Sequence, residues 1–227
     1  MDLELRDKVA IVTGGNRGIG KAIAWQLAKE GVDVALIARD RAALETAATE
    51  IARATNRGVK GFVADTGDDA AVKTGVAQAL GEFGRVDILV NCAAAVGGQG
   101  KPPTLVEITN EPFFADMNVK VLGYLRTIRE VAPHMAARGG GRIINISGLA
   151  ALHTGSTIGS IRNVGVAALT KNLADDLRRP ESRWSAYTRV VRAPKRPTSS
   201  SNGKPGGRAS PLTRSNVGWP EPISHSE

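Results

Sequence analysis

The chain has 227 residues and a formal net charge of +8, with 42% hydrophobic and 4% aromatic residues. This length and apolar content suit one α/β domain with a sizeable core, and no apolar run is long enough to cross a membrane. The single Cys92 cannot form an internal disulfide, and no apolar segment typical of a signal peptide follows Met1. We therefore expect a cytoplasmic protein.

The positive charge is concentrated near the C-terminal end of the sequence. Residues 1–177 contain 20 Lys and Arg against 19 Asp and Glu, a net charge of +1, whereas residues 178–227 contain 10 against 3, a net charge of +7. Nucleic-acid-binding domains carry a basic patch, and single-strand binders interleave it with aromatic residues, which this basic segment largely lacks. We therefore expect neither nucleic acid nor a membrane as a partner.

The most informative stretch is TGGNRGIG at residues 13–20, which directly follows the apolar run at residues 9–12. Such a run is typical of a buried parallel strand, and the apolar spacing after the last glycine is typical of a helix. Gly14, Gly18 and Gly20 therefore lie at a strand-to-helix turn. There they allow a tight bend, a close approach of the backbone to a pyrophosphate and close packing of helix on strand. This context predicts a dinucleotide-binding loop, with the phosphates at the helix N-terminus.

Strand and helix patterns alternate along the rest of the domain. Apolar runs predict strands at residues 8–13, 33–38, 59–64, 86–91 and 142–147. Helices are expected to begin at Gly18, to follow the N-cap candidates Asp40 and Asp68, and to cover residues 111–137, with a bend near Pro133, and residues 158–177. This alternation predicts right-handed βαβ units, so the expected fold class is α/β, a Rossmann-type doubly wound parallel sheet.

The composition changes after residue 177. Ser occurs three times before this point and nine times after it, Pro occurs four times before and seven times after, and the apolar periodicity ends. Segments of this kind bury too little apolar surface to fold. We therefore expect a dinucleotide-binding domain at residues 1–177 and a disordered, basic, Pro/Ser-rich tail at residues 178–227.

Residues 7–177 resemble the short-chain dehydrogenase/reductase family. The motif at residues 13–20 is similar to the family's cofactor loop, and Asp65 matches the acidic residue near the adenine. Asn-Cys-Ala-Ala at residues 91–94 resembles the segment under the ribose and nicotinamide, and RIINISG at residues 142–148 resembles the fifth strand. The resemblance implies cofactor contacts at Gly14, Asn16, Arg17, Gly18, Ile19, Gly20, Arg39, Asp65, Thr66, Asn91, Cys92 and Ala93.

The choice of cofactor depends on the end of the second predicted strand. A carboxylate there would bind the ribose hydroxyls of NAD(H) and repel a 2′-phosphate, but this chain has Ala38 followed by Arg39. A guanidinium binds a phosphate bidentately, and Arg17 in the glycine loop adds a second positive charge. NADP(H) is therefore favoured over NAD(H). The alternative is that both arginines are solvated surface charges.

The catalytic residues are where the sequence departs from the family. The resemblance implies Asn118, in the long helix, and Ser147 as catalytic residues, with a Tyr as proton donor and a Lys one helical turn later. Anchored on the segment VAALTKNLA, the Tyr position falls at Gly159 and the Lys position at Asn163. Glycine has no proton to donate, and asparagine has no charge to stabilise a phenolate. The family's serine position is Gly148, one place after Ser147.

Other polar residues near this position are candidates for the missing acid. They are Ser160, Arg162, His153 and Tyr124. An imidazole in a loop and an arginine on a helix face are more often surface groups, and Cys92 after a buried strand more often packs as a small hydrophobe. We therefore assign none of them as a substitute acid, and the sequence shows no cluster of metal ligands.

The resemblance also implies a sixth strand and a Pro-Gly turn after the fifth helix, and the sequence predicts neither. Shifting the reading frame by one base over residues 180–194, with suitable synonymous codons, gives a run that contains Val-Val-Arg-Ile-His-Pro-Gly-Arg-Thr-Arg-Thr-Glu. This run resembles the missing segment. We therefore hypothesise that the tail is translated out of frame and that the sheet lacks its last strands, which the nucleotide sequence would test.

These observations favour an oxidoreductase that transfers hydride between NADP(H) and a carbonyl or alcohol substrate. Two alternatives stay open, a catalytically impaired NADP(H)-binding protein and a non-functional truncated product. The expected partner is a small-molecule substrate, and the resemblance implies a homodimer or homotetramer. The substrate itself is not predicted, because the resemblance places the substrate loop beyond the last predicted helix.

Overall fold

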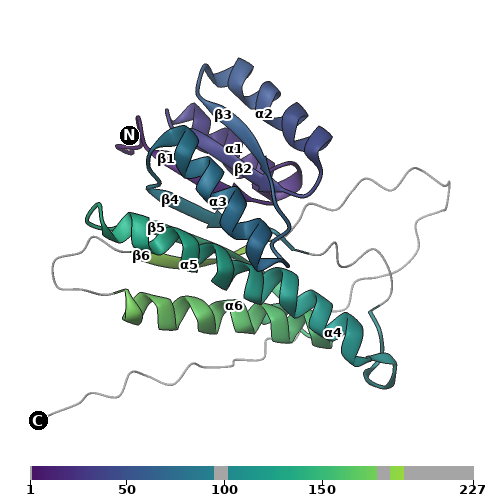
Figure 1. Cartoon of the computed structure of the whole chain (residues 1–227). Coiled ribbons are helices and arrows are strands. Elements are labelled where there is room, and N and C mark those ends of the chain that lie inside the picture. Colours follow the sequence, from purple (N-terminus) through teal and green to yellow (C-terminus); the bar gives the residue numbers. More distant parts are fainter. Residues whose placement is uncertain (1, 95–101, 178–184, 192–227) are drawn as a thin grey trace, which may run out of the picture. The chain divides into compact units, whose positions relative to one another are not determined.

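A computed structural model of the chain describes residues 2–94, 102–177 and 185–191 (Figure 1). Residues 1–193 form one compact unit, and residues 194–227, which form the other, lie outside the described residues. In the described part of the first unit, six parallel strands make one sheet in the order β3-β2-β1-β4-β5-β6. This order confirms the predicted doubly wound sheet. The strands are β1 (Val9–Thr13), β2 (Asp33–Ala38), β3 (Val59–Val63), β4 (Ile88–Asn91), β5 (Arg142–Gly148) and β6 (Ser185–Val191).

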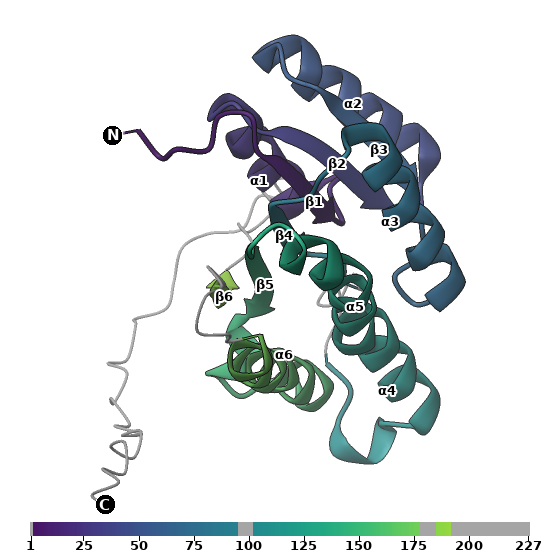
Figure 2. The same cartoon turned by 60° about the vertical axis from the view of Figure 1, so that its left-hand side comes forward.

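Helices cover both faces of the sheet, as Figure 2 shows for α1 on one side and α3 and α5 on the other. Adjacent strand residues point to opposite faces, so Ile11 joins the buried cluster that includes Val76 and Ile128, and Val12 joins the cluster that includes Ala24 and Leu44. The helices are α1 (Gly18–Lys29), α2 (Arg41–Thr55), α3 (Asp69–Phe83), α4 (Asn110–Met117), α5 (Gly123–Ala136) and α6 (Thr157–Asp176).

The helix starts follow the caps that the sequence predicts. Asp40 caps α2 by accepting a hydrogen bond from the Ala43 N–H, and Asp68 caps α3 by accepting one from the Ala71 N–H. Ser156 caps α6. Within the described ranges, every helix is too short or too polar to span a membrane.

The long helix expected at residues 111–137 is divided by a wider turn. The π-helical segment η2 (Asn118–Leu122) separates α4 from α5, whereas Pro133, where we expected a bend, lies inside α5. A π-turn takes an extra residue per turn and changes the direction in which neighbouring side chains point. This turn is what places Lys120, described below.

The expectation that the sheet lacks its sixth strand is wrong. β6 pairs in parallel with β5, from Ser185 opposite Arg142 to Val191 opposite Gly148, so β5 is not an edge strand. The segment SAYTRVV contains the β-branched and aromatic residues that favour strands, within a region whose Ser and Pro content obscured them. The tail that we predict to be disordered spans residues 178–227; β6 lies within it, and its other residues, 178–184 and 192–227, lie outside the described residues. The domain limit at residue 177 and the out-of-frame origin of the tail therefore stay predictions.

Candidate functional site

The glycine loop lies between β1 and α1, at the carboxyl end of a strand that pairs with β2 on one side and β4 on the other. Gly14 has a φ of +66° and Gly18 a φ of +55°, conformations that favour glycine. A Cβ on Gly20 would overlap the carbonyl oxygen of Gly14. The loop thus lies where the order of the strands reverses, the place where open α/β sheets bind ligands.

The segment after β4 is held against this loop. Thr13 Oγ1 accepts hydrogen bonds from the backbone N–H groups of Cys92 (3.0 Å) and Ala93 (3.2 Å). A Cβ on Gly14 would lie 3.1 Å from the backbone of Ala93. The structure therefore brings together the two backbone segments that the sequence assigned to the cofactor, and it adds Thr13 as their link.

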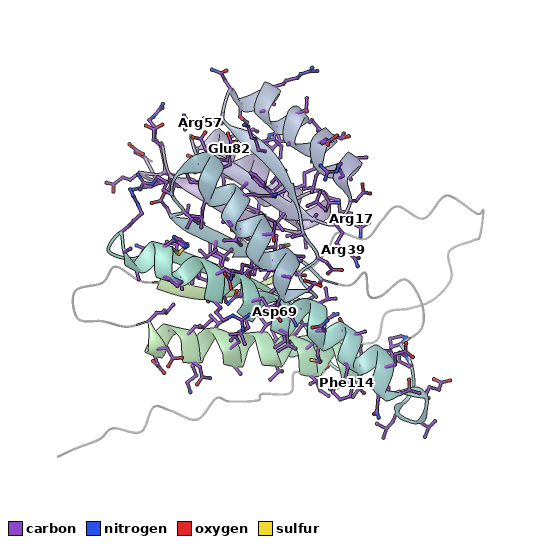
Figure 3. All side chains as sticks on the ribbon, viewed as in Figure 1. Arg17, Arg39, Arg57, Asp69, Glu82 and Phe114 are labelled. Carbon is purple, nitrogen blue, oxygen red and sulfur yellow. The ribbon has the colours of Figure 1, made fainter. Side chains whose placement is uncertain are left out.

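Two arginines extend from the carboxyl ends of the neighbouring strands β1 and β2 (Figure 3). Arg17 is the N-cap residue of α1, and its side chain makes no capping hydrogen bond. Arg39 follows β2, and its Nη1 lies 3.6 Å from Asp65 Oδ2 in an exposed ion pair. Such a pair contributes little to stability, so breaking it would cost the folded protein little.

Asn91 belongs to a buried polar network. Its Nδ2 donates to Asn145 Oδ1 (2.9 Å), and its Oδ1 accepts from Thr127 Oγ1 (2.6 Å). Asn145 Nδ2 donates in turn to Thr170 Oγ1 (2.9 Å). All four side chains are buried. The network joins β4, β5, α5 and α6 below the site, and it occupies the Asn91 side chain that the resemblance assigned to the cofactor.

Asn118 lies beside the loop after β3. Its Nδ2 donates to the Gly67 carbonyl oxygen (3.0 Å), and its Oδ1 accepts from Arg126 Nη2 (2.8 Å). Thr66 Oγ1 donates to the Val119 carbonyl oxygen (3.1 Å), which links the same two segments. The structure does not bring the Asn118 side chain into hydrogen-bond contact with Ser147, and its expected catalytic role stays a prediction.

Ser147 and Asn163 are in contact. The buried Ser147 Oγ donates to the Asn163 carbonyl oxygen (3.1 Å), and Asn163 Nδ2 donates to the Gly159 carbonyl oxygen (2.7 Å). A Cβ on Gly159 would lie 2.8 Å from the Oγ of Ser156, the capping residue of α6. The position at which the family carries its tyrosine therefore lies directly beside the helix cap.

Lys120 is the site residue that the sequence reasoning missed. It lies on η2 with 5% of its surface exposed, and its Nζ donates to Asn163 Oδ1 (2.9 Å). Burial lowers the pKa of Lys120 from 10.5 to about 8, and the charge of Arg162 acts in the same direction. The sequence did contain a signal for this site. Lys120 is the single charged residue within the apolar run VKVLG, on a helix that packs against the catalytic region.

The other candidate acids are less suitable. Burial raises the pKa of the Tyr124 hydroxyl well above its ordinary value, and that hydroxyl donates to the Ile146 carbonyl oxygen (3.0 Å). Burial also raises the pKa of Cys92 to about 11. Arg162 Nη1 binds both carboxylate oxygens of Asp116, and His153 is exposed.

The lowered pKa of Lys120 predicts a pH effect on folding. Between pH 7 and pH 9 the folded protein releases a proton that the unfolded chain keeps, so the free energy of unfolding rises with pH. We expect the wild type to gain about 1.4 kcal/mol over this range relative to Lys120→Met, measured by urea denaturation. Both proteins carry Cys92, so its titration affects both alike. A difference that stays constant from pH 7 to pH 9 would contradict the shift.

Comparison of the sequence with known proteins identifies relatives of this chain. The family model described as short chain dehydrogenase matches residues 8–184. The short-chain reductase protein NovJ of Streptomyces niveus is 38% identical over 174 residues, 76% of this chain and 64% of that protein. Dehydrogenase/reductase SDR family member 4 of Oryctolagus cuniculus is 35% identical over 177 residues, 76% of this chain and 66% of that protein.

Solved structures agree with these relatives. L-Sorbose reductase from Gluconobacter frateurii, in complex with NADPH and L-sorbose, has a TM-score of 0.72 and 31% identity, covering 78% of this chain and 66% of that one. NAD⁺-bound xylitol dehydrogenase has a TM-score of 0.74 and 27% identity, covering 82% of this chain and 70% of that one. The chain thus spans about two thirds of the length of these proteins. It belongs to the short-chain dehydrogenases, a family of NAD(P)-dependent oxidoreductases.

Proposed function

We propose that the chain is an oxidoreductase that transfers a hydride between NADP(H) and a carbonyl or alcohol substrate. The observation that carries this proposal is the loop at Gly14–Gly20. It combines positive φ angles, a close backbone approach at Gly20 and an α1 N-terminus that no side chain of its own caps. An uncapped helix N-terminus offers backbone N–H groups to a phosphate.

The residues around the loop fit a nicotinamide dinucleotide. The backbone of the glycine loop would hold the pyrophosphate, and Cys92 and Ala93, tied to Thr13, would lie under the ribose and nicotinamide. The bound nicotinamide would supply or accept the hydride. Ser147 lies near the carboxyl end of β5, at the same edge of the sheet. Cytoplasmic location and assembly into dimers or tetramers belong to this proposal as well.

NADP(H) is the favoured form because the end of β2 offers no carboxylate. Arg39 follows Ala38 there, and Arg17 adds positive charge from the neighbouring loop. Solved neighbours include complexes with NADPH and with NAD⁺, so the preference is argued from these two arginines.

The test is a titration of the protein with NADPH and with NADH, followed by fluorescence. For Arg39→Ala we expect the Kd for NADPH to rise about tenfold or more, because a charge-assisted contact with the 2′-phosphate is lost. The Kd for NADH should stay unchanged. Arg53→Ala, an exposed arginine at the other end of α2, is the matched control. If the wild type binds NADH more tightly than NADPH, the preference is refuted.

A second candidate is a protein that binds NADP(H) without turnover. Gly159 and Asn163, in place of the family's Tyr and Lys, favour it. Tight NADPH binding by a protein that oxidises no alcohol and reduces no carbonyl in a broad panel would support this function.

A further inference from the structure

We propose that Lys120 is the proton donor of the active site, held in place by Asn163 and Ser147. This inference rests on the proposed reduction of a carbonyl, and it names the residue that replaces the missing tyrosine.

The first observation is an exchange of residue types. The resemblance calls for an asparagine on the long helix and a lysine at position 163. The structure has the reverse at the point of contact, with Lys120 on η2 and Asn163 on α6, joined by a hydrogen bond of 2.9 Å. Asn118 does not compete for this place, because residues two apart on a helix point in roughly opposite directions. Its side chain accordingly contacts Gly67.

The second observation is that the Lys120 ammonium has more N–H groups than it has hydrogen-bond acceptors among the described residues. An ammonium has three N–H groups, and among the described residues Asn163 Oδ1 is the one hydrogen-bond acceptor of Lys120 Nζ. A buried cation without a carboxylate partner is costly. Two free donors on such a group suit the oxygen of a polarised carbonyl, which would accept a hydrogen bond from one of them.

The third observation concerns the charged and titratable groups packed around Lys120. Arg162 on α6 is paired with Asp116 on α4, so their charges largely cancel. Cys92, after β4, has a raised pKa of about 11, and Tyr124, on α5, also has a raised pKa, so both are neutral at physiological pH. Within this set Lys120 is the group that titrates near neutral pH, where a general acid works best.

Asn163 and Ser147 act as positioning residues. Asn163 accepts from Lys120 through Oδ1 and donates through Nδ2 to the Gly159 carbonyl oxygen, which fixes the orientation of its amide. Ser147 Oγ donates to the Asn163 carbonyl oxygen. The ammonium therefore points from η2 to Asn163, whose backbone is in turn tied to Ser147 near the carboxyl end of β5.

The proposed step balances as follows in the reducing direction. The carbonyl carbon accepts the hydride that bound NADPH supplies, and the electrons of the C=O π bond move to the oxygen. That oxygen takes a proton from Lys120 Nζ, whose N–H bond breaks as the O–H bond of the alcohol forms. The neutral amine then recovers its proton from water.

The activity test compares wild type, Lys120→Met and Lys60→Met. Met is similar to Lys in length and suits a buried site, and Lys60 is an exposed lysine on β3 that pairs with Glu82. With acetophenone, cyclohexanone and benzaldehyde as substrates, we expect Lys120→Met to lower kcat about 100-fold or more, the size of a general-acid effect. NADPH binding should be unchanged, and Lys60→Met should match the wild type. The wild-type kcat should fall above about pH 8.

A second measurement is independent of turnover. In protein labelled with [¹³Cε]lysine, the Lys120 signal, identified by its absence from Lys120→Met, should titrate well below the signals of the surface lysines. In Asn163→Ala its midpoint should fall further, because the hydrogen bond that favours the charged form is lost. A Lys120 signal that titrates together with the surface lysines would overturn the inference.

The outcomes separate the inference from the proposed function. A wild type that reduces a carbonyl, with Lys120→Met equally active, refutes Lys120 as the donor and leaves the oxidoreductase intact. A wild type that binds NADPH and reduces no substrate refutes the reaction and the donor together, and supports the binding protein. A wild type that binds neither NADPH nor NADH refutes the proposed function itself.

Discussion

Replacing Gly20 with alanine is expected to lower the free energy of unfolding by about 1–3 kcal/mol. The added Cβ would overlap the Gly14 carbonyl oxygen and lie 2.8 Å from the Gly14 carbonyl carbon, both of them backbone atoms. A backbone contact of this kind cannot be relieved by rotating a side chain, so the loop and the first turn of α1 must separate. We expect NADPH binding to weaken about 10- to 30-fold, because the phosphate loses the aligned helix terminus.

Gly81→Ala is the matched control for this substitution. Gly81 lies within α3, and nothing lies within 4 Å of the place that its Cβ would take. Alanine there should raise stability by up to about 1 kcal/mol, since it is the better helix former. NADPH binding should not change. Urea denaturation and fluorescence titration measure both effects, and equal behaviour of the two variants would show that the Gly20 contact does not matter.

Replacing Asn145 with leucine is expected to cost about 2–3 kcal/mol of stability. Asn145 is fully buried, and the substitution removes the acceptor of Asn91 Nδ2 and the donor to Thr170 Oγ1. Thr170 keeps its bond to the Val166 carbonyl oxygen, so the main penalty comes from the unpaired amide of Asn91. The measurement is the free energy of unfolding in urea.

The double variant Asn91→Leu/Asn145→Leu tests this explanation. With both amides gone, no donor is left buried and unpaired, because Thr127 Oγ1 also bonds to the Tyr124 carbonyl oxygen (2.9 Å). The double variant should therefore lose less stability than the two single variants together. Losses that simply add would show that each leucine acts through packing and not through the hydrogen bond.

Features fixed by local spacing could be predicted from the sequence. Gly14, Gly18 and Gly20 lie in one short turn whose backbone conformation and close contacts require glycine. The capping residues Asp40 and Asp68 bond to N–H groups only three residues away. Alternating strands and helices then predict right-handed βαβ units and a parallel sheet. These parts of the fold and of the cofactor loop follow from short-range physics.

Features that depend on tertiary contacts could not be predicted in this way. The strand β6 is a short segment, and composition taken over the last 50 residues outweighed its β-branched residues. Lys120 lies on the π-helical segment η2 and contacts Asn163 on α6, a pairing between two helices that spacing within one helix does not reveal. The family's motif places its lysine on the same helix as its tyrosine, which is α6 here. In this chain the buried lysine is Lys120, which lies on η2 instead.

The cap at the start of α6 also limits how this chain could evolve. A tyrosine at position 159 would bring its Cβ within 2.8 Å of Ser156 Oγ, so this hydroxyl would have to rotate, and a lysine at position 163 would place a second ammonium where Lys120 already makes its hydrogen bond. The first change would weaken the cap of a helix, and the second would set like charges side by side. A return to the family's usual pair would thus be favoured by compensating changes at Ser156 and at Lys120.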